Sequence, residues 1–193
     1  MFFRILALLP LVSLVTANSL VSRSDVVVPV CNAISNMNTT AIALQNACTN
    51  FEAQPTNDMA MPIMKFGFAL EGESSSGINV CPSDVLSSGD TEILFNALKD
   101  LYDTIQKLVS SILKLKDAII AAGYEAQSCV AVEMMATSTT TFMDKVYACS
   151  ADEYKGPLDE MRSGVLTMMA QAKFSYCGTV SPRGSSKVSG VEI

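Results

Sequence analysis

The segment from Thr91 to Ala122 constrains the fold most, because apolar side chains recur along it with an unbroken helical spacing. Neither proline nor glycine interrupts it, and Gly123 then follows as a residue typical of helix ends. Steps of three and four residues separate its apolar positions, which are Leu94, Leu98, Leu101, Ile105, Leu108, Ile112, Leu115 and Ile119. This is the period of one face of an amphipathic helix. We predict a helix of about 45 Å that forms the spine of the fold.

Two helices are predicted before this segment. Pro29 suits the first turn of a helix that runs to about Phe51. Its apolar stripe comprises Val30, Ile34, Met37, Ala41, Leu44, Cys48 and Phe51. A shorter helix runs from Asp58 or Met61 to about Leu70. Residues 71–88 are rich in serine and glycine, so we expect a loop there.

Two helices are predicted after it, one over about 125–148 and one ending near Tyr176. Ser150 and Glu153 have the spacing of a capping box, and Gly156-Pro157 could delay the start of the last helix. No segment alternates with the period of a strand. Short loops make consecutive helices antiparallel. The expected fold is therefore all-α, an antiparallel bundle of four to five helices stapled by disulfides.

The N-terminus has the layout of a secretory signal peptide. Arg4 precedes the apolar run Ile5–Val15, and small residues end at Ala17, after which we expect cleavage. The run is too short to cross a bilayer. We expect a signal peptide over 1–17, a flexible lead over 18–28, the bundle domain over 29–177 and a disordered tail over 178–193. The protein would be secreted, to the extracellular space or the cell wall.

Six cysteines follow the expected cleavage site: Cys31, Cys48, Cys81, Cys129, Cys149 and Cys177. An even number in an exported chain indicates three disulfides, for which 15 pairings are possible. Two cysteines far apart on one helix cannot pair, because a disulfide needs Cα atoms within about 7 Å. From the antiparallel layout we predict the pairs Cys129–Cys177, Cys31–Cys149 and Cys48–Cys81.

Residues for catalysis, metal binding or nucleic-acid binding are scarce. The chain has no histidine, which removes the commonest general base and metal ligand. No Gly-x-Ser-x-Gly elbow and no glycine-rich phosphate loop occurs. A net charge of −6 disfavours contact with a phosphate backbone. We predict a protein that is not an enzyme, without cofactor or metal, and without a nucleic-acid partner.

Methionine is frequent, with 11 residues, and tryptophan is absent. Methionine mostly fills cores, yet its flexible side chain also suits sites for varied apolar ligands. Of the adjacent pairs Met134-Met135 and Met168-Met169, one member of each should lie at the flank of the core. The candidate lipid-binding residues are Leu101, Ile105, Leu108, Ile112, Met135, Phe142, Met161, Val165 and Met168. Asn38-Thr39-Thr40 is an N-glycosylation sequon.

The order of these segments resembles the fungal hydrophobic surface-binding protein A family, which includes cell wall galactomannoproteins. The resemblance lies in the segments 33–44, 87–98, 105–119 and 140–146. It implies an exported helical bundle that adsorbs to hydrophobic surfaces, with relatives that bind fatty acids between their helices. The six cysteines depart from this family and favour a lipid pocket over adsorption by unfolding.

Three kinds of function follow. The first is binding of a fatty acid or other apolar small molecule inside the bundle. The second is adsorption to a hydrophobic surface or to wall material. The third is a secreted effector that binds a host protein. The elicitins, which are six-cysteine helical sterol carriers, are a further alternative, although their chain is shorter and their cysteine spacing differs.

Overall fold

The computed structural model describes the backbone of residues 18–178 and the side chains of residues 25–178. Within this range the chain is all-helical. Its five helices are α1 (Asn18–Ala53), α2 (Asn57–Val80), α3 (Ser88–Ala121), α4 (Glu125–Cys149) and α5 (Asp152–Cys177). The signal peptide predicted over 1–17 and almost all of the tail predicted over 178–193 lie outside the described residues. No described helix is long and apolar enough to cross a membrane.

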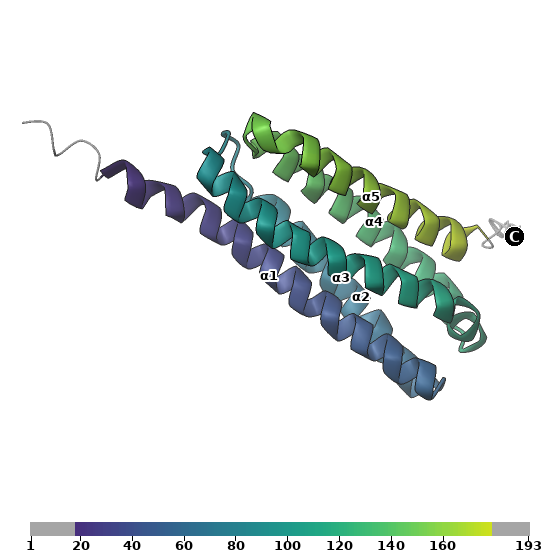
Figure 1. Ribbon diagram of the computed structural model, residues 1–193. Coiled ribbons are helices and arrows are strands. Elements are labelled where there is room, and N and C mark those ends of the chain that lie inside the picture. The colour runs from purple at the N-terminus through teal and green to yellow at the C-terminus, as the bar shows by residue number, and fades with distance from the viewer. Residues whose placement is uncertain (1–17, 179–193) are drawn as a thin grey trace, which may run out of the picture.

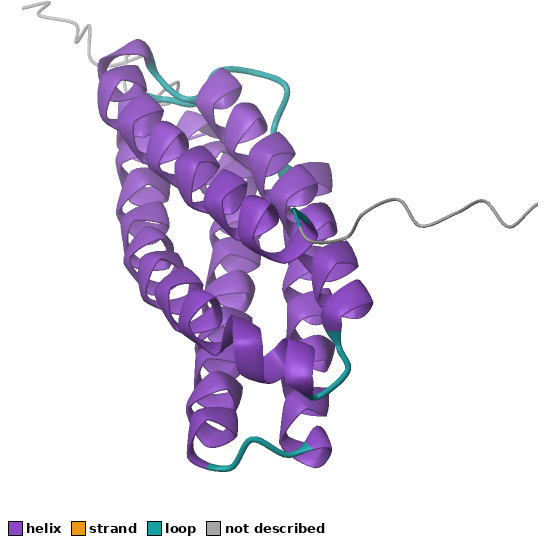
Figure 2. Ribbon diagram, turned by 90° about the vertical axis from the view of Figure 1, so that its right-hand side faces the viewer, coloured by secondary structure: helices purple, strands orange, loops and turns teal. Residues whose placement is uncertain are grey.

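The five helices form a closed ring rather than a stack of hairpins (Figures 1 and 2). Around the ring the order is α1, α2, α4, α5, α3 and back to α1, and each helix packs mainly against its two neighbours. Consecutive helices run in opposite directions, as predicted (Figure 1). The hairpin of α3 and α4 is an exception to close packing, because these two helices barely touch.

The inward faces of the helices supply one core. All eight apolar positions predicted on α3 are buried, and so are all seven positions predicted on α1. Ser87 caps α3 by accepting a hydrogen bond from the Asp90 backbone N–H at 3.2 Å. Gly123 has a φ of 86°, a conformation that residues with a side chain rarely adopt. The spine helix therefore begins at Ser88, three residues before the predicted Thr91, and ends at Ala121, next to the predicted Ala122.

Helix α1 begins earlier than predicted, so the flexible lead expected over 18–28 is wrong. Residues 18–28 are helical, and Pro29 lies inside α1 instead of in its first turn. Val27 is 3 % exposed and packs into the core. Burying a valine stabilises a fold by about 1.5–3 kcal/mol, which offsets much of the cost of a proline within a helix.

Helix α2 is longer than predicted, and most of the loop expected over 71–88 is wrong. The helix continues to Val80, which leaves Cys81–Ser87 as the connection to α3. Ser74 and Gly77 are buried within this extension. A Cβ at Gly77 would lie 2.9 Å from Cε2 of Phe142, so the missing side chain lets α2 approach α4 closely. Tertiary packing thus overrides a composition that is typical of loops.

Helix α5 also departs from the prediction at its start. It begins at Asp152, so Gly156-Pro157 does not delay it. The capping box expected from Ser150 and Glu153 is absent, because the Ser150 hydroxyl donates to the Val146 carbonyl oxygen at 2.7 Å. The turn into α5 is held from α3 instead. The Ala151 N–H donates to the Thr91 hydroxyl at 3.1 Å.

One of the three predicted disulfides is present. Cys129–Cys177 joins α4 to α5, whereas Cys31, Cys48, Cys81 and Cys149 are free thiols. The predicted pairs Cys31–Cys149 and Cys48–Cys81 are wrong. The Cys81 thiol instead lies beside that of Cys149, and the Leu86 N–H donates to the Cys149 carbonyl oxygen at 2.7 Å.

Cys48 is at the other end of the ring, close to Tyr176. Helix α5 separates Tyr176 from the Cys149 end by about 35 Å, at 1.5 Å per residue. Cys48 therefore cannot reach Cys81. Burial, with a contribution from nearby Glu52, raises the pKa of the Cys48 thiol to about 12.

Replacing Gly77 by alanine tests the close contact between α2 and α4. We expect Gly77→Ala to destabilise the fold by about 1–3 kcal/mol, because the new methyl group overlaps Phe142. Gly72→Ala on the same helix is the control, since nothing lies within 4 Å of its Cβ position. It should stabilise the fold by up to about 1 kcal/mol through helix propensity. Urea unfolding of both variants measures the difference, and equal effects would contradict the helical assignment of residues 71–80.

Peptide mapping without reduction tests the cysteine arrangement. We expect the Cys129–Cys177 bridge, and we expect treatment with a small-molecule disulfide to add a Cys81–Cys149 bridge by thiol–disulfide exchange. Cys48 should react with an alkylating reagent only on unfolding, because its thiol is buried and its pKa is high. A Cys48–Cys81 or Cys31–Cys48 peptide would contradict the fold.

Candidate functional site

Two small apolar cavities lie inside the ring of helices, one beyond the other along its axis. We call them cavity A and cavity B. Their volumes are about 30 Å³ and about 20 Å³. Cavity A is lined by Met37, Leu70, Ser74, Leu98, Leu101, Tyr102, Ile105, Thr139, Phe142, Met143, Met161 and Val165. Every one of the five helices contributes to this wall.

Cavity B lies nearer the end of the ring that carries the disulfide. It is lined by Leu44, Ile63, Met64, Gly67, Ile112, Ile119, Ser128, Ala131, Val132, Met135 and Tyr176. All five helices contribute here as well. From Leu101 in cavity A to Ile112 in cavity B, α3 rises about 16 Å. The two cavities are therefore separate points on one axis, and a single extended molecule could pass through both.

Apolar packing separates the cavities. Leu108 lies between Ile105 and Ile112 on the inner face of α3, is 2 % exposed and lines neither cavity. Methionines contribute to both walls, with Met37, Met143 and Met161 in cavity A and Met64 and Met135 in cavity B. Such side chains adopt several rotamers at little cost. The side chains at and between the cavities can therefore rearrange.

The walls contain no Asp, Glu, Lys or Arg side chain. Their polar groups are hydroxyls. The Tyr176 hydroxyl, at cavity B, donates to the Ile112 carbonyl oxygen at 2.7 Å. Burial is the main cause that raises the pKa of Tyr176 above its ordinary range. A ligand in these cavities would meet apolar surface and hydroxyl groups, and no formal charge.

The structure distributes the nine predicted site residues over both cavities. Five of them line cavity A, namely Leu101, Ile105, Phe142, Met161 and Val165. Ile112 and Met135 line cavity B. Leu108 and Met168 line neither, since Leu108 lies between the cavities and Met168 is a partly buried side chain at the flank of the core. Their role in binding a lipid stays a prediction.

The flanking methionines follow the predicted pattern. Met135 is buried and Met134 is 41 % exposed, and Met169 is buried while Met168 is only partly buried. On α5 the inward position is thus Met169, one residue beyond the predicted Met168. Asn38 lies on α1 with its Oδ1 atom buried and without a hydrogen-bond partner among the described residues. Its glycosylation stays a prediction.

Sequence reasoning missed the contribution of α1 and α2 to the walls. Met37 and Leu44 belong to the predicted apolar stripe of α1, so the same period could have found them. On α2, Gly67 and Leu70 lie within the helix predicted to about Leu70, whereas Ser74 lies in the segment predicted as a loop, so its place in the wall could not be read from the sequence. No local pattern could have singled out Tyr102, since it depends on how α3 and α5 approach each other.

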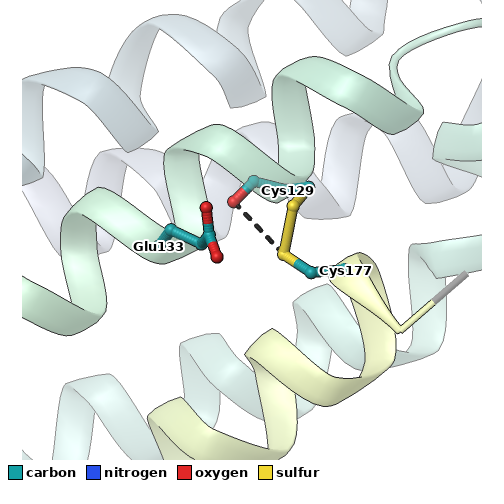
Figure 3. A group of neighbouring side chains, drawn as sticks. All are labelled: Cys129, Glu133 and Cys177. Carbon is teal, nitrogen blue, oxygen red and sulfur yellow. Dashed lines mark hydrogen bonds between the residues drawn. A yellow bond between two sulfur atoms is a disulfide. The ribbon is translucent and has the colours of Figure 1, made fainter. Parts of the chain in front are cut away.

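One cluster outside the cavities has the composition of a metal site. Cys129, Glu133 and Cys177 have ligand atoms within 4.8 Å of one another (Figure 3). The two cysteines form the disulfide, which offers no thiolate to a metal. Glu133 pairs with Lys173, whose Nζ lies 3.1 Å from Oε1. The cluster therefore acts as a link between α4 and α5.

Truncating Leu108 tests the partition between the cavities. We expect Leu108→Ala to destabilise the fold by about 2–5 kcal/mol, because it leaves a void in a well-packed core. Ile93→Ala on the same helix is the control, since Ile93 is 54 % exposed and its loss should cost less than about 0.5 kcal/mol. A crystal structure of Leu108→Ala should show cavities A and B joined. Two cavities that remain separate would contradict the partition.

The fold is shared with solved structures of low sequence identity. Afmp4p in complex with palmitic acid has a TM-score of 0.72 at 14 % identity, with 78 % of this chain and 99 % of that chain covered. Ligand binding domain 2 of the Penicillium marneffei MP1 protein, complexed with multiple arachidonic acids, has a TM-score of 0.64 at 15 % identity, with 83 % and 97 % covered. These likenesses show the fold.

No family model matches the chain. Among curated proteins, a cell wall galactomannoprotein of Armillaria ostoyae is 96 % identical over 193 residues, which is the full length of both chains. Identity at this level over the full length of both chains shows a shared family. The chain belongs to the cell wall galactomannoprotein family.

Proposed function

We propose that this protein binds long-chain fatty acids, or lipids of similar shape, inside its ring of helices. The observation that carries the proposal is the pair of apolar cavities aligned on one axis and lined by all five helices. A linear acyl chain matches this arrangement, because it is long, narrow and apolar. The buried apolar area of such a chain would supply the main driving force.

The related structures support the same class of ligand. Afmp4p was solved with palmitic acid and the MP1 domains with arachidonic acids, and both share the fold of this chain. Their sequence identity to this chain is 14 % to 15 %, so the likeness shows a shared fold and does not identify the wall residues. The proposal therefore rests on the shape and apolar character of the cavities in this chain.

Binding requires the cavities to widen. Each has room for only about one or two water-sized groups, whereas a fatty acid has many more atoms. We propose that methionines at the walls change rotamer and that the side chains around Leu108 move aside, so that one channel replaces two cavities. The displaced side chains lose contacts with one another, and a ligand that fills the channel makes new apolar contacts in their place.

The role is non-catalytic. The walls lack carboxylates, amines and thiols, and the sequence has no histidine, so the commonest general bases are missing there. The family suggests action in the cell wall or outside the cell. An oxidising environment would also allow the second bridge between Cys81 and Cys149 to form beside Cys129–Cys177.

Titration of delipidated protein with palmitic acid tests the proposal. We expect saturable binding that Gly67→Leu weakens by at least about tenfold, because the new side chain points into cavity B. A Cβ at Gly67 meets only Ala131, at 4.0 Å, so the first atom of the new side chain fits without a clash. Gly72→Leu on the same helix adds the same side chain where nothing lies within 4 Å, and it should leave the affinity unchanged.

Two results would count against the proposal. If the wild-type protein binds no palmitic acid but adsorbs to a hydrophobic resin, surface adsorption replaces binding inside the ring. If Gly67→Leu and Gly72→Leu bind equally well, the acyl chain does not occupy cavity B. Thermal unfolding of both variants establishes that each is folded at the temperature of the titration.

A further inference from the structure

Some side chains that line cavity A carry hydroxyl groups without a hydrogen-bond partner in the part of the chain that the structure describes. Three side chains bring a hydroxyl to this wall: Ser74, Tyr102 and Thr139. Ser74 is committed, because its hydroxyl donates to the Leu70 carbonyl oxygen at 2.9 Å and lies 3.4 Å from the Met37 sulfur. Tyr102 and Thr139 have no hydrogen-bond partner among residues 25–178. Two residues whose hydroxyls have no such partner thus line an almost wholly apolar cavity.

Tyr102 reaches its place because α5 carries a glycine opposite it. A Cβ at Gly164 would overlap the Tyr102 hydroxyl and would lie 3.1 Å from ring atoms Cε2 and Cζ. The ring therefore lies directly against the backbone of α5, at the contact between α3 and α5. Tyr102 is only partly buried, so its side chain lies at the edge of the core. This is where a polar end can meet water while its tail is buried.

Thr139 is unpaired for a local reason. A threonine in a helix usually bonds its hydroxyl to the carbonyl oxygen four residues back, as Thr140 does with Ala136 at 2.7 Å. For Thr139 that acceptor is the Met135 carbonyl, which already accepts from the Ser138 hydroxyl at 3.3 Å. The Thr139 hydroxyl is therefore left without a partner among the described residues, on a side chain that lines cavity A.

Cavity B is different, because each of its hydroxyl groups has a partner within the protein. Tyr176 donates to the Ile112 carbonyl oxygen, and the Ser128 hydroxyl lies 3.8 Å from the Met64 sulfur. Among the wall residues of the two cavities, hydroxyls without a partner are therefore found only at cavity A. A polar end that accepts hydrogen bonds finds uncommitted donors in only one orientation, with that end at cavity A and its tail towards cavity B.

We propose that the hydroxyls of Tyr102 and Thr139 bind the polar end of the lipid and set its direction in the ring. The inference rests on the proposed function. Both hydroxyls can donate and accept, and neither cavity has a lysine or arginine in its wall. Recognition is therefore by hydrogen bonds. The ligand class is a long linear lipid with one small polar end, a fatty acid or a fatty alcohol.

Ligands that share a tail but differ at the end test this inference. Palmitic acid, hexadecanol and hexadecane are titrated into the wild-type protein, Tyr102→Phe and Thr139→Val. Each substitution removes one hydroxyl and keeps the shape. We expect each to weaken binding of the acid and the alcohol by about 3- to 10-fold, the value of one hydrogen bond, and to leave hexadecane unchanged. Tyr154→Phe and Thr140→Val are the controls, because neither residue lines a cavity.

Gly164→Ala provides a second test that keeps both hydroxyls in the protein. The new methyl group displaces Tyr102, so binding of the acid should weaken while that of hexadecane should not. Gly156→Ala on the same helix, with nothing within 4 Å of its Cβ position, should change neither.

The outcomes separate this inference from the proposed function. If the wild-type protein, Tyr102→Phe and Thr139→Val bind all three ligands with the same affinity, the inference is overturned and the proposed function is kept. Equal losses for palmitic acid and hexadecane would also overturn it, since the side chains would then act through shape alone. A wild-type protein that binds none of the three would overturn the proposed function and this inference with it.

Discussion

Closure of five helices into a ring is the constraint on which the rest of the structure depends. Each helix packs mainly against two neighbours, so its inward side chains face a central space rather than one partner helix. Large buried side chains, among them Phe51, Phe142 and Tyr176, fill most of that space. Protein interiors are normally packed to high density, so the two cavities that remain mark the places where this filling is incomplete.

Directional bonds fix the ends of the ring, and apolar packing fills the middle. At one end the Cys129–Cys177 disulfide joins α4 to α5, and Tyr176 bonds to the backbone of α3. At the other end the turn into α5 bonds to Thr91 of α3. Between them, contacts among methionine, leucine and isoleucine side chains dominate the interior. Such contacts have no fixed direction, so the middle can rearrange around a ligand while the ends stay closed.

The helical period predicted the parts of the fold that are decided locally, whereas the capping box expected before α5 does not form. The eight apolar positions of α3 and the glycine that ends it could be read directly, and the same holds for the stripe of α1. The second half of α2 could not, because Ser74 and Gly77 are helical only through close packing against other helices. The cysteine pairs depend on which helices are neighbours around the ring, and Tyr102 depends on Gly164 across the contact of α3 and α5. Both are contacts between residues far apart in the sequence, so the spacing of residues within one helix cannot predict them.

The central claim is that a lipid lies along the axis of the ring. A crystal structure of the protein saturated with palmitic acid tests it most directly. The account predicts density for one acyl chain that passes the level of Leu108, with its tail in cavity B and its carboxyl group beside Tyr102 and Thr139. Density for the fatty acid on the outer surface, with cavities A and B unchanged, would contradict it.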